Sequence, residues 1–263
     1  MGLRVHIGEA LIGLLGEHRT LELPEGAARH VQVMRLQPGD ELNVFDGAGH
    51  EWLTRVTRMG KRDVAVEVVQ AVTVDKELAT RVTLAVGVPA NDRMDTIVEK
   101  AAELGVYAIQ PLMCERAVLR LSGERAAKKV AHWQAVAISA CEQCGRAVVP
   151  VIEPVRSLES WVASMGEPSG ETVGRRRAVL SLRETKWIGN WLVDAAPGAG
   201  SPQEWVFLSG PEGGLSHQEE QMAIQAGFQA ISLGSRTLRA DTAPIAIMSI
   251  VSTLRPPGAQ STD

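Results

Sequence analysis

The chain has 263 residues, of which 45% are hydrophobic, and a formal net charge of -4. Such a chain buries one large core or two smaller ones, and its balance of charge does not indicate a general nucleic-acid binder, whose surface is normally basic. No stretch has the roughly 18 apolar residues that cross a bilayer, and residues 1–9 lack the apolar core of a signal peptide. We therefore expect a cytoplasmic protein with no membrane partner.

The first part of the chain has the alternating pattern of β-strands. Residues 41–45 and 63–69 follow the two-residue period, and turn sequences lie at 38–40 and 46–49. After Gln70 the pattern changes to apolar runs that alternate with helical periods.

We therefore predict a small β-rich domain over residues 1–72 and a larger domain over residues 73–255, followed by a loose tail at 256–263.

In the larger domain, strands and helices alternate. Strand patterns lie at 82–88, 108–113, 177–182 and 205–208; helical patterns lie at 92–104, 124–144, 216–226 and 242–254; loops are expected at 165–175 and 195–203. This order predicts an α/β fold whose largely parallel sheet is covered on both faces, with ligands bound beyond the carboxyl ends of the strands. The last helix is apolar around most of its circumference, so either a subunit interface or an intrachain core has to bury it.

Two glycine-bearing turns follow strands of this sheet. Gly210–Gly214 comes after Trp205–Leu208, and Leu233–Ala243 contains the second turn. Glycine lets the backbone approach a ligand closely. Neither the phosphate-loop motif nor the dinucleotide fingerprint is present, and Glu212 places a negative charge where a phosphate would bind, which favours a cationic or neutral ligand. The alternative is a tight turn before a helix capped by Ser216 and Glu219.

A family resemblance extends over nearly the whole chain. Its motifs, in order, are His30–Leu36, Pro38–Asp40, Phe45–Gly47, Glu99–Val106, Pro111, Glu115–Arg116, Glu142–Gln143, Gly145–Arg146, Pro150, Gly210–Gly214 and Leu233–Arg239. Together they resemble the RsmE family, SPOUT-class methyltransferases that methylate N3 of a uridine in 16S ribosomal RNA with S-adenosylmethionine.

The resemblance implies a trefoil-knotted parallel-sheet domain preceded by a small PUA-like RNA-binding β-barrel, and a homodimer acting on 16S rRNA of the small ribosomal subunit. Sequence rules alone would not propose a knot. It also implies a cofactor site for S-adenosylmethionine formed by Leu182, Gly210, Pro211, Glu212, Gly213, Gly214, Leu233, Gly234, Ser235, Arg236 and Leu238.

Two residues beside the second turn are candidates for catalysis. Arg239 is expected to stabilise the uracil anion that forms when N3 loses its proton, or else to make a salt bridge or phosphate contact. Asp241 is either a general base or the N-cap of the final helix. The family often has Glu at this position, and the shorter Asp weakens a base role that depends on reach.

The candidate RNA contacts are His30, Arg35, Arg116 and Arg146. Arg116 begins a basic run that continues through Lys129 and is either a local RNA patch or a solvated helix face. Cys141 and Cys144 lie near the end of a helix, where the dipole does not favour a thiolate, and no second cysteine pair completes a zinc site. We therefore expect buried structural cysteines and no metal. Glu142 and Gln143 are expected at the pocket or at the dimer interface.

Two other functions remain open at this stage. The same scaffold can act on a different rRNA or tRNA base, or the chain can be a ribosome assembly factor without catalysis.

Overall fold

The computed structural model describes residues 2–8, 19–166, 175–183, 186–193 and 203–254. The chain divides into two compact units: Met1–Glu77 with Ala137–Val149, and Leu78–Val136 with Pro150–Asp263. Residues 73–77 and the end of the helix expected at 124–144 thus fall in the first unit. The predicted domains 1–72 and 73–255 stay a prediction, and the predicted tail lies outside the described residues.

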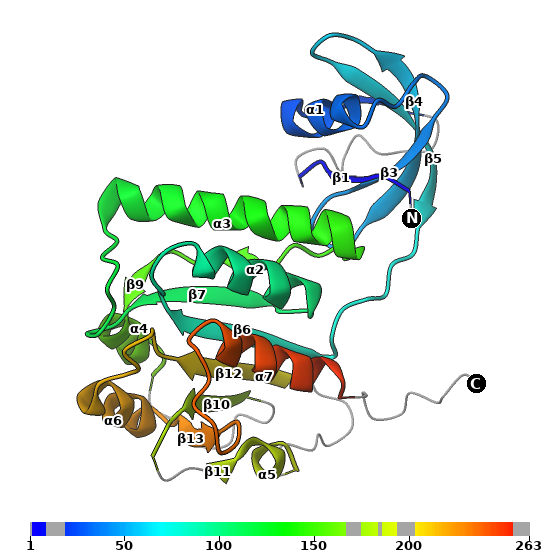
Figure 1. Cartoon of the computed structure of the whole chain (residues 1–263). Coiled ribbons are helices and arrows are strands. Elements are labelled where there is room, and N and C mark those ends of the chain that lie inside the picture. Colours follow the sequence, from blue (N-terminus) through cyan, green and yellow to red (C-terminus); the bar gives the residue numbers. More distant parts are fainter. Residues whose placement is uncertain (1, 9–18, 167–174, 184–185, 194–202, 255–263) are drawn as a thin grey trace. The chain divides into compact units, whose positions relative to one another are not determined.

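The first unit is built on a five-stranded mixed sheet in the order β1-β3-β4-β5-β2 (Figure 1). Its strands are β1 (Arg4–His6), β2 (Thr20–Glu22), β3 (Glu41–Phe45), β4 (Glu51–Met59) and β5 (Val64–Val72). Strands β1 and β3 are parallel and the other pairs are antiparallel. Over the described residues the ladder runs from β1 to β2 without closing, so the expected barrel is seen as a mixed sheet.

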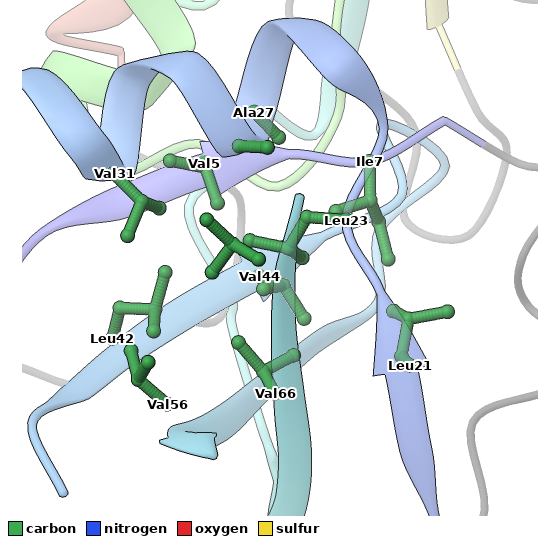
Figure 2. Close-up of a cluster of buried hydrophobic side chains, with 12 residues drawn as sticks. Val5, Ile7, Leu21, Leu23, Ala27, Val31, Leu42, Val44, Val56 and Val66 are labelled. Atoms are coloured by element: carbon green, nitrogen blue, oxygen red, sulfur yellow. The ribbon is translucent and has the colours of Figure 1, made fainter. Parts of the chain in front are cut away.

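Helix α1 (Glu25–Val33) covers the core of this sheet. It buries Ala27, Ala28 and Val31. Figure 2 shows Val31 and Ala27 of α1 in one hydrophobic cluster with the strand residues Val5 and Val44. Apolar residues from the strands and from α1 therefore form one core on the α1 face of the sheet.

The second unit is a parallel sheet in the order β11-β13-β10-β12-β6-β7-β8, with β9 also paired to β7. The strands are β6 (Thr80–Gly87), β7 (Ala108–Met113), β8 (Val151–Ile152), β9 (Arg156–Ser157), β10 (Arg175–Leu180), β11 (Lys186–Trp187), β12 (Gln203–Ser209) and β13 (Gln229–Ser232). The helices are α2 (Arg93–Glu103), α3 (Gly123–Cys144), α4 (Leu158–Ser164), α5 (Ile188–Val193), α6 (His217–Gln225) and α7 (Thr242–Ser252). Helix α3 ends in the first unit.

Helices cover both faces of this sheet. Leu208 of β12 packs in a cluster with Trp161 of α4 and Ala223 of α6. Its neighbour Phe207 points to the opposite face, because successive strand residues alternate, and contacts Trp191 of α5 with ring centroids 5.2 Å apart. Helix α7 contacts β12 and lies beside α2 (Figure 1). The predicted α/β class with a parallel sheet is confirmed.

The predicted element boundaries are close to the observed ones. The strand expected at 177–182 is β10 at 175–180, because residues 181–183 already form the loop at its end. The final helix ends at Ser252 rather than Leu254. Most of the loops expected at 165–175 and 195–203 lies outside the described residues.

Candidate active site

A cavity of about 510 Å³ lies where β10, β12 and β13 end. Every residue that was expected to bind the cofactor, except Ser235, lines this cavity. The residues that line it are Arg93, Leu180, Ser181, Leu182, Ser209, Gly210, Pro211, Glu212, Gly213, Gly214, Ile231, Ser232, Leu233, Gly234, Arg236, Thr237, Leu238, Arg239, Ala240 and Ala243. The two glycine turns, about twenty residues apart in sequence, therefore form the walls of one cavity beyond the carboxyl ends of a parallel sheet.

Close backbone approach explains the glycines of the first turn. A Cβ at Gly210 would lie 2.7 Å from the backbone of Gly214 and Leu215, and a Cβ at Gly213 would lie 2.9 Å from Cβ of Arg116. Gly214 has a backbone φ of +67°, a conformation that residues with a side chain rarely adopt. The turn therefore requires glycine at three positions.

The helix after this turn is capped as the sequence predicts. Ser216 Oγ accepts from the backbone N–H of Glu219, and the Glu219 carboxylate accepts from the N–H of Ser216. Glu219 also accepts a hydrogen bond from the backbone N–H of Glu115 at 2.7 Å. The turn at Gly210–Gly214 is therefore both a tight turn before a capped helix and part of the cavity wall, so the two interpretations of the sequence do not exclude each other.

Glu212 is engaged within the protein. Its Oε1 accepts hydrogen bonds from Arg93 Nη1 at 2.8 Å and from the backbone N–H of Ala90 at 3.0 Å. Because Arg93 compensates the carboxylate, the charge of Glu212 is a weaker argument for a cationic ligand than the sequence suggested. Its structural effect is to tie the loop after β6 to the glycine turn.

The second turn carries the two candidate catalytic residues. Arg239 is exposed, and its side chain makes no ion pair or hydrogen bond with the described residues. Asp241 is at the N-cap position of α7, as the sequence predicts, but its backbone angles are helical and its side chain makes no capping hydrogen bond. Its Oδ1 is buried and has no partner in the described structure. The backbone carbonyl of Arg239 instead accepts from the N–H groups of Thr242 and Ala243, at 3.0 Å each.

Sequence patterns did not reveal a polar network beside the cavity. Glu220 is buried, and its carboxylate accepts hydrogen bonds from Ser181 Oγ and from Arg183 Nη1. Ser181 lines the cavity at the end of β10. Glu220 follows the capping box in a polar run, which predicts an exposed residue, so only the fold identifies its partners.

The candidate RNA contacts fall in different environments. Arg116 is exposed and donates to the carbonyl oxygens of Gly213 and Leu215. Arg35 is exposed with φ 58° just after α1. His30 Nδ1 lies 3.4 Å from a carboxylate oxygen of Glu142.

Arg146 does not lie on the surface that an RNA contact needs. Its side chain is 3% exposed and pairs with Glu77 at 2.5 Å. Its carbonyl oxygen accepts from Arg4. Glu142 contacts His30 and accepts from the backbone N–H of His6, so it belongs to the first unit and is not among the residues that line the cavity; its place at a dimer interface stays a prediction.

The cysteines are unbridged, and the described residues contain no group of three or more His, Cys, Asp or Glu side chains able to hold a metal. Cys141 is buried as expected, but Cys144 is only partly so. The Cys141 side chain lowers the pKa of Cys144 to about 6 against the effect of burial, with help from the backbone N–H of Arg146. The surroundings of Cys144 thus favour the thiolate more than its place near a helix end suggests, and the expectation of a purely structural cysteine there stays a prediction.

Comparison with known proteins defines the class of this chain. Residues 76–252 match the model of the RNA methyltransferase domain, and residues 23–69 match that of the RNA methyltransferase PUA domain. No helix among the described residues is long and apolar enough to span a membrane. The fold and the matches together define an RNA methyltransferase.

More specific similarity comes from individual proteins. The ribosomal RNA small subunit methyltransferase E of Mycobacterium bovis is 31% identical over 84% of this chain and 81% of that protein. The chain belongs to the ribosomal RNA small subunit methyltransferase E family, as the resemblance to RsmE implied.

Two solved structures are similar over almost their full lengths. One is the family member from Neisseria gonorrhoeae bound to S-adenosyl methionine, with 34% identity, a TM-score of 0.82 and coverage of 96% of this chain and 98% of that one. The other is a putative methyltransferase from Legionella pneumophila in complex with the same cofactor, with 30% identity, a TM-score of 0.84 and coverage of 95% and 97%.

Proposed function

We propose that this chain methylates N3 of a uridine in 16S ribosomal RNA of the small subunit, with S-adenosylmethionine as methyl donor. The observation that carries the proposal is the cavity formed by the two glycine turns. It is supported by family members named ribosomal RNA small subunit methyltransferase E, one of which was solved with this cofactor bound. The uridine and its N3 atom come from the family resemblance.

The residues of the cavity fit this cofactor. Its volume of about 510 Å³ lies within the roughly 300–1,000 Å³ typical of small-molecule sites. Gly210 and Gly213 have no side chain, so their backbone atoms form part of the cavity wall. Leu182, Leu233 and Leu238 give the wall apolar surface. When bound, S-adenosylmethionine supplies an electrophilic methyl group on a sulfonium. The absence of a phosphate-loop lysine agrees with a ligand that has no phosphate.

On the protein side, the chemistry requires a uracil N3 that has lost its proton. Arg239 lies on the cavity wall with no competing carboxylate among the described residues, so its guanidinium is available to stabilise the uracil anion. Asp241 is the proposed general base: it does not itself line the cavity, but it lies in sequence between Ala240 and Ala243, which do, and its buried Oδ1 has no hydrogen-bond partner among the described residues. Positioning supplies a further part of the rate.

RNA binding is proposed for cations at the edge of this cavity. Among the described residues Arg116 donates only to carbonyl oxygens, so its positive charge has no carboxylate partner there. Arg236 and Arg239 are exposed on the second turn. Together they give a local positive surface to a protein with a net charge of -4, and phosphate contacts need only such a patch. In the first unit, His30 and Arg35 are the proposed contacts.

A homodimer is also proposed. Helix α7 buries Pro244, Ile247, Met248 and Val251, whereas Ile245 and Ile250, which flank this face on either side, stay partly exposed. A second copy would cover these isoleucines. Sedimentation at micromolar concentration is expected to give a dimer, and a pure monomer would contradict it.

The decisive experiment is a methyl-transfer assay with purified small ribosomal subunits, naked 16S rRNA and tRNA, followed by nucleoside mass spectrometry. We expect N3-methyluridine in 16S rRNA. A methyl group on another base or on tRNA would replace the substrate assignment. Calorimetry that shows no binding of S-adenosylmethionine to the folded protein at millimolar concentration would instead favour an assembly factor without catalysis.

A further inference from the structure

One buried polar group of the cavity has no role in holding the fold together. Ser209 is the last residue of β12 and lines the cavity. The residue is 5% exposed, and its Oγ is buried without a hydrogen-bond partner in the described part of the chain. A buried hydroxyl in this state destabilises the protein, so its presence needs an explanation.

The packing of β12 does not provide that explanation. Trp205, Phe207 and Ser209 lie on the same face of the strand because side chains alternate. Trp205 and Phe207 contact Trp191, with ring centroids 5.4 and 5.2 Å apart. This face is an apolar stripe, and an apolar side chain would continue it at position 209 without leaving a polar atom unsatisfied.

The other buried or partly buried hydroxyls of the cavity wall have partners in the protein. Ser181 Oγ donates to Glu220, and Ser232 Oγ donates to the carbonyl oxygen of Gly234 at 3.0 Å. Gly234 N–H in turn donates to Ser232 Oγ at 3.2 Å. Ser181 and Ser232 are therefore committed to loop structure, whereas the hydrogen-bonding capacity of Ser209 is unused.

We propose that Ser209 is a cofactor-binding residue whose hydroxyl hydrogen-bonds a polar atom of bound S-adenosylmethionine. Rotation between staggered rotamers about the Cα–Cβ bond turns Oγ toward the cavity, and a hydroxyl both donates and accepts. The inference rests on the proposed function. It explains why a polar residue ends an apolar stripe: the cost of the unsatisfied hydroxyl in the free protein is offset when the cofactor binds.

The proposal predicts that affinity and stability separate in Ser209→Ala, which removes only the oxygen. Without cofactor, we expect a melting temperature equal to or above that of the wild type, because no internal hydrogen bond is lost. With S-adenosylmethionine, calorimetry is expected to give a Kd about five- to ten-fold higher. Ser209→Cys, which keeps the side-chain shape but donates weakly, is expected to raise Kd as well.

Ser232→Ala is the matched control on the same cavity wall. Its hydroxyl makes two internal hydrogen bonds, so the cofactor-free melting temperature is expected to fall, which shows that the measurement detects a lost internal bond.

Three outcomes would overturn the proposal. A clear fall in the cofactor-free melting temperature of Ser209→Ala with unchanged Kd would mean that Oγ has a structural partner. Equal affinity in the wild type, Ser209→Ala and Ser209→Cys would remove the binding role and leave the proposed function intact. No binding by the wild type would overturn both.

Discussion

Arg116 Nη1 donates a hydrogen bond to the carbonyl oxygen of Gly213 at 3.2 Å, across 97 positions of sequence. The same guanidinium nitrogen lies 3.5 Å from the carbonyl oxygen of Leu215. An arginine expected from sequence to contact RNA therefore also supports the loop that forms one wall of the cavity.

We expect Arg116→Ala to weaken both cofactor and RNA binding. Loss of a donor to the glycine loop is worth roughly 0.5–1.5 kcal/mol, which corresponds to a Kd for S-adenosylmethionine raised about two- to ten-fold. Arg125→Ala is the control: Arg125 is also exposed and its replacement removes the same charge, but no hydrogen bond among the described residues joins it to the loop. If Arg116→Ala leaves the cofactor affinity at the value of Arg125→Ala, the loop contact has no energetic role.

Gly210→Ala is expected to abolish detectable cofactor binding. The added Cβ meets backbone atoms of Gly214 and Leu215 at 2.7 Å, and backbone cannot move aside without opening the turn. Gly26→Ala in α1 is the matched change, since nothing lies within 4 Å of its Cβ, and alanine is expected to stabilise that helix by up to about 1 kcal/mol. Calorimetry and urea unfolding measure the two effects. Normal cofactor affinity in Gly210→Ala would show that the turn is not part of the site.

The first unit contains a buried ion pair between Arg4 and Glu51, 2.6 Å apart, with each side chain 4% exposed. Arg4 Nη1 also donates to the carbonyl oxygen of Cys141. Arg4→Met leaves a buried carboxylate without its cation and is expected to destabilise the protein by about 3–5 kcal/mol in urea unfolding. Arg55→Ala, which breaks the exposed pair with Glu41, is expected to cost about 1 kcal/mol or less. Equal costs would mean that burial does not strengthen the pair.

The same pair sets a pH dependence. Burial raises the pKa of Glu51, but the hydrogen bonds from Arg4 and Asn43 outweigh it, and the net pKa is below its ordinary value of 4.5. The folded state therefore binds this proton less tightly than the unfolded chain. The resulting stability is present above pH 4.5 and is lost as the pH falls through the lowered pKa. In Glu51→Gln this contribution to acid unfolding is expected to disappear.

The sequence predicted the parts of this protein that depend on neighbours along the chain. The alternation of β12, the glycine turn and the capping box of Ser216 and Glu219 are local patterns, and each lies where expected. The sequence also predicted that the two turns form one pocket, because the carboxyl ends of parallel strands lie at the same edge of the sheet.

The residues that differ from expectation depend on contacts and backbone angles that the local sequence pattern does not show. Arginine is usually a surface residue, but after folding Arg146 is buried, its side chain pairs with Glu77, and its carbonyl oxygen accepts a hydrogen bond from Arg4. Asp241 stands where an N-cap belongs, yet the chain enters α7 with helical angles that leave its carboxylate unable to cap. Ser209 continues a strand pattern in which nothing marks its hydroxyl as unsatisfied.

Cys144 is expected to be the most reactive cysteine. Its pKa is lowered to about 6, whereas burial raises the pKa of Cys114 to about 12. Because the thiolate is the nucleophile, the rate of iodoacetamide alkylation of Cys144 is expected to rise with a midpoint near pH 6 and to be nearly constant above pH 7. Peptide mass mapping over a pH series measures each site. Cys141→Ala removes the neighbouring side-chain group that lowers this pKa, so the midpoint is expected to move upward; a midpoint near 9 in the wild type would contradict the prediction.

Arg239→Ala separates the chemical step from cofactor binding. The side chain lies on the cavity wall and makes no hydrogen bond or ion pair with the described residues, so its removal is expected to leave stability and the Kd for S-adenosylmethionine nearly unchanged. Stabilisation of the uracil anion by a placed donor is worth roughly 3–4 kcal/mol, so turnover is expected to fall about 100- to 1,000-fold. Arg236→Ala on the same turn is the control for charge alone and is expected to weaken RNA binding more than turnover. Equal loss of cofactor affinity and turnover in Arg239→Ala would instead make Arg239 a residue of the cofactor site.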